Sequence, residues 1–273
     1  MSFVLLTHGS EHAERVLLAL AAREVVPDAI LIAQPAPTAR RDEPKRSRRA
    51  TVAALLARLG GGGGVVLKQD WVSRFTGFAP RVQGVGRIDF APVTVALREL
   101  QPEWLLLADS GIVSPAVLAV PGRGTLNGHP ALLPWVRGVS VIEHSILRGV
   151  APGATVHLVD AGIDTGPVVR RVLVPVTPHD TLDTLWRKSM ARSAELAAEV
   201  VAAIARGTLP GPRPQSRKVA YCGWATPEER RRATEAIAGG AAHRLFEEWR
   251  AFFGGDELPL DDERLPDTLR PPA

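Results

Sequence analysis

Two short motifs hold the side chains of this sequence that are best suited to chemistry. The first is LNGHPALLPWVRG at residues 126–138, and the second is DAGIDTGP at residues 160–167. Both set polar groups beside glycine and proline, which fix the course of the chain in turns and loops. Binding and catalytic residues are often carried on loops of this kind. The two motifs together therefore point to an enzyme.

The polar groups of these motifs suit acyl transfer to an amine. The side-chain amide of Asn127 and a protonated imidazole at His129 can both donate hydrogen bonds to a developing oxyanion. A carboxylate such as Asp164 can keep the imidazole charged or accept a proton from the nucleophile. The alternative is that both motifs are turns and nothing more, since Asn-Gly and Asp-x-Gly are common turn sequences. Their co-occurrence favours catalysis.

Short apolar runs around the motifs predict the strands that position them. Residues 104–108 (WLLLA) and 154–159 (ATVHLV) have the length of buried strands, and residues 168–176 predict a further strand. We therefore expect Asn127 and His129 just past a strand end, where open α/β sheets bind their ligands.

The paired motifs resemble those of a known family. The pattern Asn-x-His-Pro-x-Leu-Leu-Pro, followed by Asp-x-Gly-x-Asp-x-Gly-Pro, is similar to that of the folate-dependent formyltransferases, which include glycinamide ribonucleotide, methionyl-tRNA and sugar amino-group formyltransferases. The similarity extends upstream through residues 89–115, and it covers residues 85–190 in all. By this resemblance Asn127, His129 and Asp164 correspond to the catalytic Asn, His and Asp of the family.

The resemblance implies an α/β fold with a Rossmann-like formyltransferase domain that takes a formyl group from 10-formyltetrahydrofolate. The acceptor amine would attack the formyl carbon, Asn127 and His129 would stabilise the oxyanion, and Asp164 would set the charge of His129 and assist proton removal. No metal is expected, because His8 and His12 have no third ligand near them. The pterin pocket is expected to be lined by Ser110, Gly111, Ile112 and Val113 from one loop and by Val159, Asp160, Ala161 and Ile163 from another.

The N-terminal part of the chain predicts alternating strands and helices. Residues 3–6 and 29–33 are apolar enough for buried strands, and residues 11–23 have the apolar spacing of a helix. Further predicted elements are a short helix at residues 51–59, a strand at 65–67, and an unusually long connection with aromatic side chains at 68–87.

The C-terminal part predicts helices. A helical pattern capped by Asp180 runs to Gly207 and closes a catalytic domain at residues 1–207, and a Pro-rich connector then begins a mostly helical extension at residues 208–273. Within the extension we expect a strand at residues 219–222, a helix opened by a capping box at Thr226, and a helix at residues 241–253.

The acceptor is constrained by two departures from the family. The turn at residues 7–10 (THGS) lacks the glycine-rich loop with which glycinamide ribonucleotide formyltransferases hold phosphate, and the extension does not resemble the barrel of methionyl-tRNA formyltransferases. We therefore expect a small-molecule amine, foremost a nucleotide-linked amino sugar, and no nucleic-acid partner. Methionyl-tRNA or glycinamide ribonucleotide formyltransferase, a 10-formyltetrahydrofolate hydrolase and a non-catalytic folate-binding protein stay open as alternatives.

The composition is that of a globular protein. The 273 residues are 45% hydrophobic, and no run reaches the roughly 18 apolar residues that span a membrane. The single cysteine, Cys222, excludes an internal disulfide, which is typical of a protein in a reducing compartment. We therefore expect a cytoplasmic protein without a membrane partner. The basic cluster within residues 40–49 suits either phosphate binding or a solvated loop. The aromatic residues at 241–253 suit either a homodimer surface or packing on their own domain.

Overall fold

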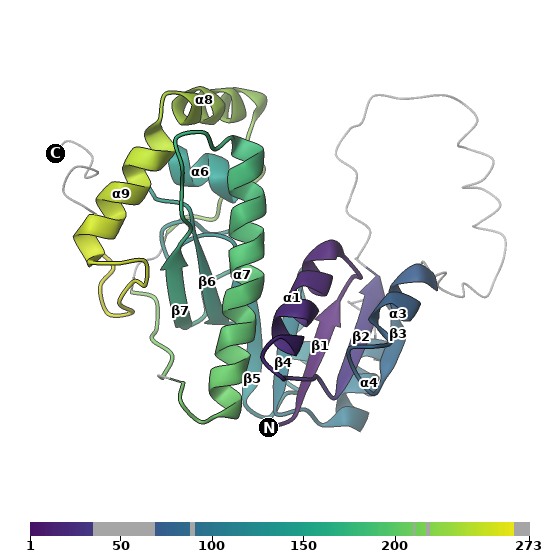
Figure 1. Ribbon diagram of the computed structural model, residues 1–273. Helices are drawn as coiled ribbons and strands as arrows, with labels where there is room; N and C mark the ends of the chain where they lie inside the picture. The colour runs from purple at the N-terminus through teal and green to yellow at the C-terminus, as the bar shows by residue number, and fades with distance from the viewer. Residues whose placement is uncertain (35–68, 88–90, 210, 217–218, 265–273) are drawn as a thin grey trace, which may run out of the picture.

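A mixed seven-stranded sheet forms the centre of the computed structural model, with strand order β3-β2-β1-β4-β5-β6-β7 (Figure 1). The structure describes residues 1–34, 69–87, 91–209, 211–216 and 219–264. The predicted helix at residues 51–59, the predicted strand at 65–67 and the basic cluster within 40–49 lie outside the described residues. The expected α/β fold is confirmed.

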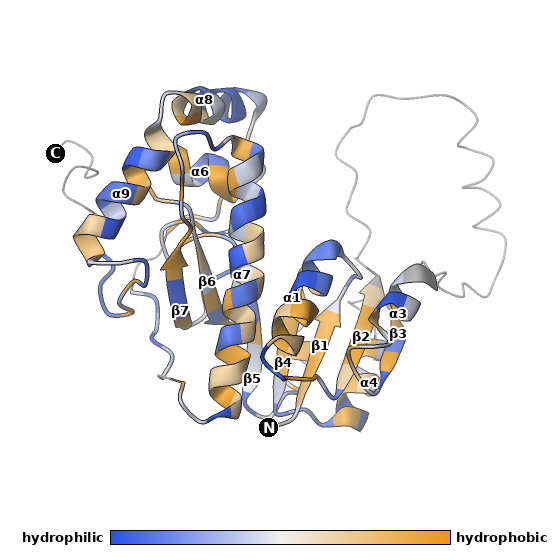
Figure 2. Ribbon diagram, in the orientation of Figure 1, coloured by the Kyte–Doolittle hydropathy of each residue, from blue (hydrophilic) through white to orange (hydrophobic). Residues whose placement is uncertain are grey.

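The N-terminal half of the sheet is parallel. Strands β1 (Phe3–Thr7) and β4 (Trp104–Ala108) are buried along their whole length, as their continuous apolar sequence predicts. Figure 2 shows β1 in the orange of hydrophobic residues. Strand β2 (Ala29–Gln34) follows α1 (Glu11–Ala21) and pairs with β1 in parallel. The helices that follow along the chain are α3 (Gln69–Phe75), α4 (Ala91–Leu100), α5 (Pro115–Leu118) and α6 (Val141–Leu147).

The prediction of a long connection at residues 68–87 is wrong. This segment contains α3 and then strand β3 (Val82–Arg87), which pairs in parallel with β2. Phe75 is fully buried, and Trp71 and Phe78 pack against the core. The sequence VQGVGR has a weak strand signal because two glycines interrupt it, so its strand conformation depends on pairing with β2.

The second half of the sheet reverses direction. Strand β5 (Gly124–His129) is parallel to β4. Strand β6 (Gly153–Leu158) is antiparallel to β5, and β7 (Val168–Leu173) is antiparallel to β6. The prediction that Asn127 and His129 follow a strand end is therefore wrong, because both lie on β5 itself. Their sequence is polar, but ladders with β4 on one side and β6 on the other hold them extended.

The long helix α7 (Leu182–Ala205) lies against α1, β5 and β6. Its N-cap is Thr181, in a reciprocal capping box with Thr184, and not Asp180 as predicted. Asp180 accepts hydrogen bonds from Thr177, Thr184 and Lys188 instead, which turns its carboxylate away from the cap position. At Gly128 a Cβ atom would lie 3.0 Å from the carbonyl oxygen of Ser193, so the close approach of α7 to β5 requires glycine there.

The extension folds mainly as two helices, α8 (Pro227–Ala238) and α9 (Ala241–Phe253), in agreement with the predictions for these segments. The capping box at Thr226 is confirmed. The predicted strand at residues 219–222 is wrong, because only a single bridge joins Cys222 to Gly138. The fully buried Trp249 packs edge-on against Trp135, so α9 packs on its own chain. No helix in the described ranges is long and apolar enough to cross a membrane.

One buried cation ties the C-terminal segment to the chain around Pro134. Arg171 is fully buried on β7, and its guanidinium lies 4.6 Å from the ring centroid of Trp135. It donates hydrogen bonds to the carbonyl oxygens of Leu133 at 2.9 Å, Asp262 at 2.5 Å and Pro259. Burial is the main influence on the pKa of Arg171 and lowers it to about 10, so this side chain remains a cation at neutral pH.

We expect Arg171→Gln to lower the free energy of unfolding by about 2–4 kcal/mol, because the shorter amide leaves buried carbonyl groups without their donor. Urea unfolding measures this change. Arg187→Gln is the control, since Arg187 forms an exposed ion pair with Asp183 on α7, and its loss should cost less than about 1 kcal/mol. Equal effects of the two substitutions would contradict the role assigned to Arg171.

Candidate active site

Asn127 and His129 project from the same face of β5 because they are two residues apart on a strand. His157 pairs directly with Asn127 across the antiparallel β5–β6 ladder. The amide nitrogen Nδ2 of Asn127 lies 3.3 Å from Nε2 of His157. The sheet register thus brings an amide and two imidazoles to one place.

Asp164 completes this group from the loop between β6 and β7. Its backbone is in the left-handed region, with φ 53°. Its Oδ2 atom accepts a hydrogen bond from the backbone N–H of Gly138 at 2.9 Å and lies 3.7 Å from Nδ1 of His129. Its Oδ1 atom lies 3.6 Å from Nε2 of His157. The carboxylate, whose side chain is only 13% exposed, therefore lies between two buried imidazoles.

The surroundings set opposite preferences for charge on Asp164 and His129. Burial acts to raise the pKa of Asp164, but His129, His157 and the N–H of Gly138 together lower it well below its usual range. Burial is also the largest influence on the pKa of His129, which it lowers despite the opposing effect of Asp164. We infer an ionised carboxylate next to a neutral imidazole. Asp164 opposes the lowering of the pKa of His129, so the expected role of Asp164 in setting the charge of His129 stays a prediction.

The hydrogen bonds of the two imidazoles define their tautomers. Nε2 of His129 donates to the carbonyl oxygen of Val136 at 3.0 Å, so the lone pair of Nδ1 faces Asp164. Nδ1 of His157 donates to the carbonyl oxygen of Leu158 at 2.8 Å, so its Nε2 accepts from Asn127. This bond uses one of the two amide hydrogens of Asn127 and orients the other for a ligand.

Side chains from outside the motifs hold the Asp164 loop. Gln215, in the extension, donates to the carbonyl oxygens of Asp164 at 3.1 Å and Gly166 at 2.7 Å. Arg137 donates through Nε and an Nη atom to the carbonyl oxygen of Ile163, at 3.0 and 2.7 Å. The position of the carboxylate thus depends on both the catalytic domain and the extension.

Two cavities adjoin this group. The loop cavity, of about 130 Å³, is predominantly apolar and includes seven of the eight residues predicted for the pterin pocket. The eighth, Ser110, is buried and lines the other cavity instead. The residues that line the loop cavity are Leu107, Gly111, Ile112, Val113, Pro115, Leu118, Asn127, His157, Val159, Asp160, Ala161, Gly162, Ile163 and Asp164.

The second cavity, the His12 cavity, has a volume of about 350 Å³ and is more polar. It is bounded by α1, by the segment after β4, by β5 and by Tyr221 of the extension. Its lining consists of His12, Asp109, Ser110, Gly111, Ile112, Asn127, Gly128, His129, Pro130, Gly138, Val139, Ile163, Asp164, Met190 and Tyr221. Asn127 and Asp164 line both cavities, so these two side chains stand at their junction.

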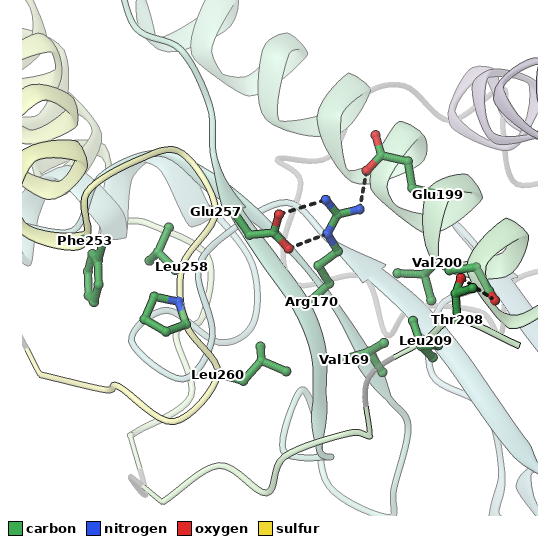
Figure 3. A pocket seen from close by; sticks show the side chains of 12 residues that line it. Val169, Arg170, Glu199, Val200, Thr208, Leu209, Phe253, Glu257, Leu258 and Leu260 are labelled. Atoms are coloured by element: carbon green, nitrogen blue, oxygen red, sulfur yellow. Dashed lines mark hydrogen bonds and ion pairs between the residues drawn. The ribbon is translucent and has the colours of Figure 1, made fainter.

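A further cavity of about 610 Å³ lies beside β7, away from this group (Figure 3). Its polar side chains are already paired, since Arg170 forms ion pairs with Glu257 at 2.8 Å and Glu199 at 2.7 Å. None of Asn127, His129 and Asp164 lines it. This cavity therefore lies apart from the candidate catalytic side chains.

The structure brings Asn127, His129 and Asp164 together as predicted, but the sequence analysis missed His157 and Gln215. A signal for His157 was present: it is the one ionisable residue in the apolar run ATVHLV, which forms the next strand after the first motif. Gln215 lies in the Pro-rich connector, and nothing in its local sequence indicates the contact with the Asp164 loop.

Comparisons with known proteins show which family part of this chain resembles. Residues 73–201 match the family described as formyl transferase. Methionyl-tRNA formyltransferase of Legionella pneumophila is 35% identical over 137 residues, which are 50% of this chain and 44% of the relative. The chain thus spans less than half the length of this curated relative.

Solved structures share the fold at low sequence identity. Phosphoribosylglycinamide formyltransferase from Streptococcus pneumoniae TIGR4 superposes with a TM-score of 0.52 at 24% identity, over 75% of this chain and 98% of that chain. A sugar N-formyltransferase from a Shewanella species superposes with a TM-score of 0.55 at 16% identity, over 87% and 88%. The family match, together with the paired motifs, identifies residues 73–201 as a formyl transferase domain.

Proposed function

We propose that this protein transfers a formyl group from 10-formyltetrahydrofolate to a primary amine. The observation that carries the proposal is the junction of two cavities at Asn127 and Asp164. One cavity can hold the formyl donor and the other the amine, so that the two substrates meet where an amide donor and an ionised carboxylate already lie.

The lining of the loop cavity suits the pterin ring of the folate. Its walls are mainly aliphatic side chains and the backbone of residues 111–113 and 159–163, which suits a flat heterocycle that presents polar atoms at its edge. The cavity reaches Asn127 and Asp164, so a donor held there would bring its formyl group to the junction. We therefore propose Gly111, Ile112, Val113, Val159, Asp160, Ala161 and Ile163 as the folate-binding residues, without Ser110, which lines the His12 cavity.

The arrangement supports a direct transfer. The amine nitrogen attacks the formyl carbon, a C–N bond forms, and the carbonyl oxygen becomes an oxyanion that the second amide hydrogen of Asn127 can stabilise. Asp164 accepts the amine proton, which can pass to the lone pair of Nδ1 on His129 at 3.7 Å. The protonated imidazole can then donate to the oxyanion or to the departing N10, and cleavage of the N10–formyl bond releases tetrahydrofolate.

We propose a nucleotide-linked amino sugar as the acceptor. In the described part of the chain the extension is helical, and it contributes Tyr221 to the His12 cavity. Methionyl-tRNA is the second candidate, because the curated relative with that name is 35% identical over half of this chain. The boundary at residue 207, a homodimer and a cytoplasmic location stay predictions.

The test mixes purified protein with 10-formyltetrahydrofolate and a panel of acceptors, and it follows release of tetrahydrofolate. The panel contains amino sugars linked to dTDP, UDP and GDP, glycinamide ribonucleotide and methionyl-tRNA, with no amine as the blank. Release that needs one acceptor supports transfer, whereas equal release in the blank would identify a hydrolase. Folate binding without release in any sample would contradict enzymatic transfer.

Asn127, His129 and Asp164 form the catalytic trio of this proposal. Substitution of each should lower kcat/KM by about 100-fold or more, as loss of an oxyanion donor or a general base does. The variants are Asn127→Ala, His129→Ala and Asp164→Asn. Asp183→Asn, on the exposed surface of α7, is the matched control and should keep full activity. Undiminished turnover in the trio variants, with folding verified by circular dichroism, would refute the site.

His157 should act as a positioning residue, because it accepts a hydrogen bond from Asn127. We expect His157→Leu to lower kcat about 10-fold while the KM for 10-formyltetrahydrofolate changes little, since the amide loses its orientation and the folate keeps its backbone contacts. Steady-state kinetics with both substrates separate the two parameters. An unchanged kcat would show that Asn127 needs no partner.

The neutral state of His129 predicts a pH dependence of stability. Because its folded-state pKa is lowered, the unfolded chain binds more protons below about pH 6.5, so stability is lost as pH falls toward 5. We expect His129→Gln to reduce this slope by up to about 1.4 kcal/mol per pH unit. Urea unfolding at pH 5, 6 and 7 measures the slope. A variant with the slope of the parent protein would contradict a neutral His129.

A further inference from the structure

His12 is an unused hydrogen-bonding group in the wall of the His12 cavity. It lies in the first turn of α1, and its ring has no hydrogen bond or ion pair among the described residues. Its Nδ1 atom is shielded from solvent and has no partner. By contrast, the rings of His8, His129 and His157 each bond to a backbone carbonyl. The ring thus has no partner among the described residues, and a ligand in the cavity can bond to its other nitrogen, Nε2.

The position of the ring proton follows from this burial. Burial is the main influence on the pKa of His12 and lowers it, with Arg15 acting in the same direction and Asp109 opposing. The imidazole is therefore neutral at neutral pH and carries one N–H group. Nδ1 is the buried nitrogen of this ring, and a buried N–H without an acceptor is rarer and costlier than a buried lone pair. The proton is therefore on Nε2. His12 thus offers an N–H donor to a ligand.

Asp109 provides the complementary group in the same cavity. It follows β4 directly, and its backbone is held in the left-handed region, with φ 56°. Its carbonyl oxygen accepts a hydrogen bond from the backbone N–H of His8 at 3.0 Å, so the turn that presents its carboxylate is tied to the end of β1. The Asp109 side chain is exposed, and it lines the cavity together with His12.

A donor beside a carboxylate is suited to a hydroxyl group. A hydroxyl oxygen can accept from Nε2–H of His12 while its hydrogen is donated to Asp109, whereas a thioether or an aliphatic chain can do neither. A phosphate would meet the negative charges of Asp109 and Asp164, and the described lining of this cavity contains no lysine or arginine. The part of the acceptor that enters is therefore polar and uncharged apart from its amine.

We propose that His12 and Asp109 bind a hydroxyl group of the acceptor, close to the amine that is formylated. This inference rests on the proposed formyl transfer, and it specifies the acceptor as a hydroxylated amine such as a sugar ring. The nucleotide of such an acceptor would lie outside the His12 cavity.

The kinetic test uses two acceptors that differ in one hydroxyl group: dTDP-4-amino-4,6-dideoxyglucose and its counterpart that lacks the 3-hydroxyl. If the panel shows preference for UDP or GDP, the same pair is used on that nucleotide. We expect His12→Phe and Asp109→Asn to lower kcat/KM about 10-fold for the hydroxylated acceptor and to change it little for the deoxy compound. Leu18→Gln, at an exposed site on α1, is the control and should affect neither.

Equal losses with both acceptors, or no loss with either, would overturn the proposal. A second readout does not depend on activity. Nitrogen-15 NMR of the imidazole of His12 should show the proton on Nε2 in the free protein, and a proton on Nδ1 would also overturn the proposal. If no acceptor is formylated while the Nε2–H tautomer is observed, the failure lies with the proposed function and not with the state of His12.

Discussion

The negative charge of Asp164 is the constraint on which the centre of this protein depends. A carboxylate removed from water is costly unless hydrogen bonds and dipoles replace its hydration. Here the N–H of Gly138 donates a hydrogen bond to the carboxylate at 2.9 Å, and the imidazoles of His157 and His129 lie 3.6 and 3.7 Å from its oxygens. The same groups limit access to the carboxylate, so it meets a substrate only at the junction of the two cavities. Stability and chemistry thus make opposite demands on one side chain.

The rest of the fold serves to place that charge. The β5–β6 register sets Asn127 opposite His157, and the glycine at position 128 admits α7 closely enough to cover the other face of the strand. The extension supports the loop from outside, because Gln215 binds the backbone at Asp164 and Gly166. Removal of the extension would therefore be expected to disturb the site as well as the core around Trp249.

The sequence supports some of these features better than others. The all-apolar strands at residues 3–7 and 104–108 could be predicted because burial on both faces leaves a continuous signal, and the trio could be predicted because fixed turns surround it. The strand β5 could not, since its conformation comes from neighbours that are distant in sequence. The charge of His129 is hard to predict for a similar reason: it depends on burial, at 4% exposure, as well as on the carboxylate beside it, and burial is a property of the whole fold. His157 and Gln215 act through contacts that no local pattern reveals.

The state of Asp164 can be measured directly. Carbon-13 NMR of side-chain carboxyl groups, with the signal assigned by its loss in Asp164→Asn, reports protonation of this one residue across a pH titration. An ionised Asp164 at every pH from 8 down to about 4, the ordinary pKa of an aspartate, is the result that this account predicts. Protonation of Asp164 between pH 6 and 7 would contradict it, because a neutral carboxylic acid could not accept the proton of the attacking amine.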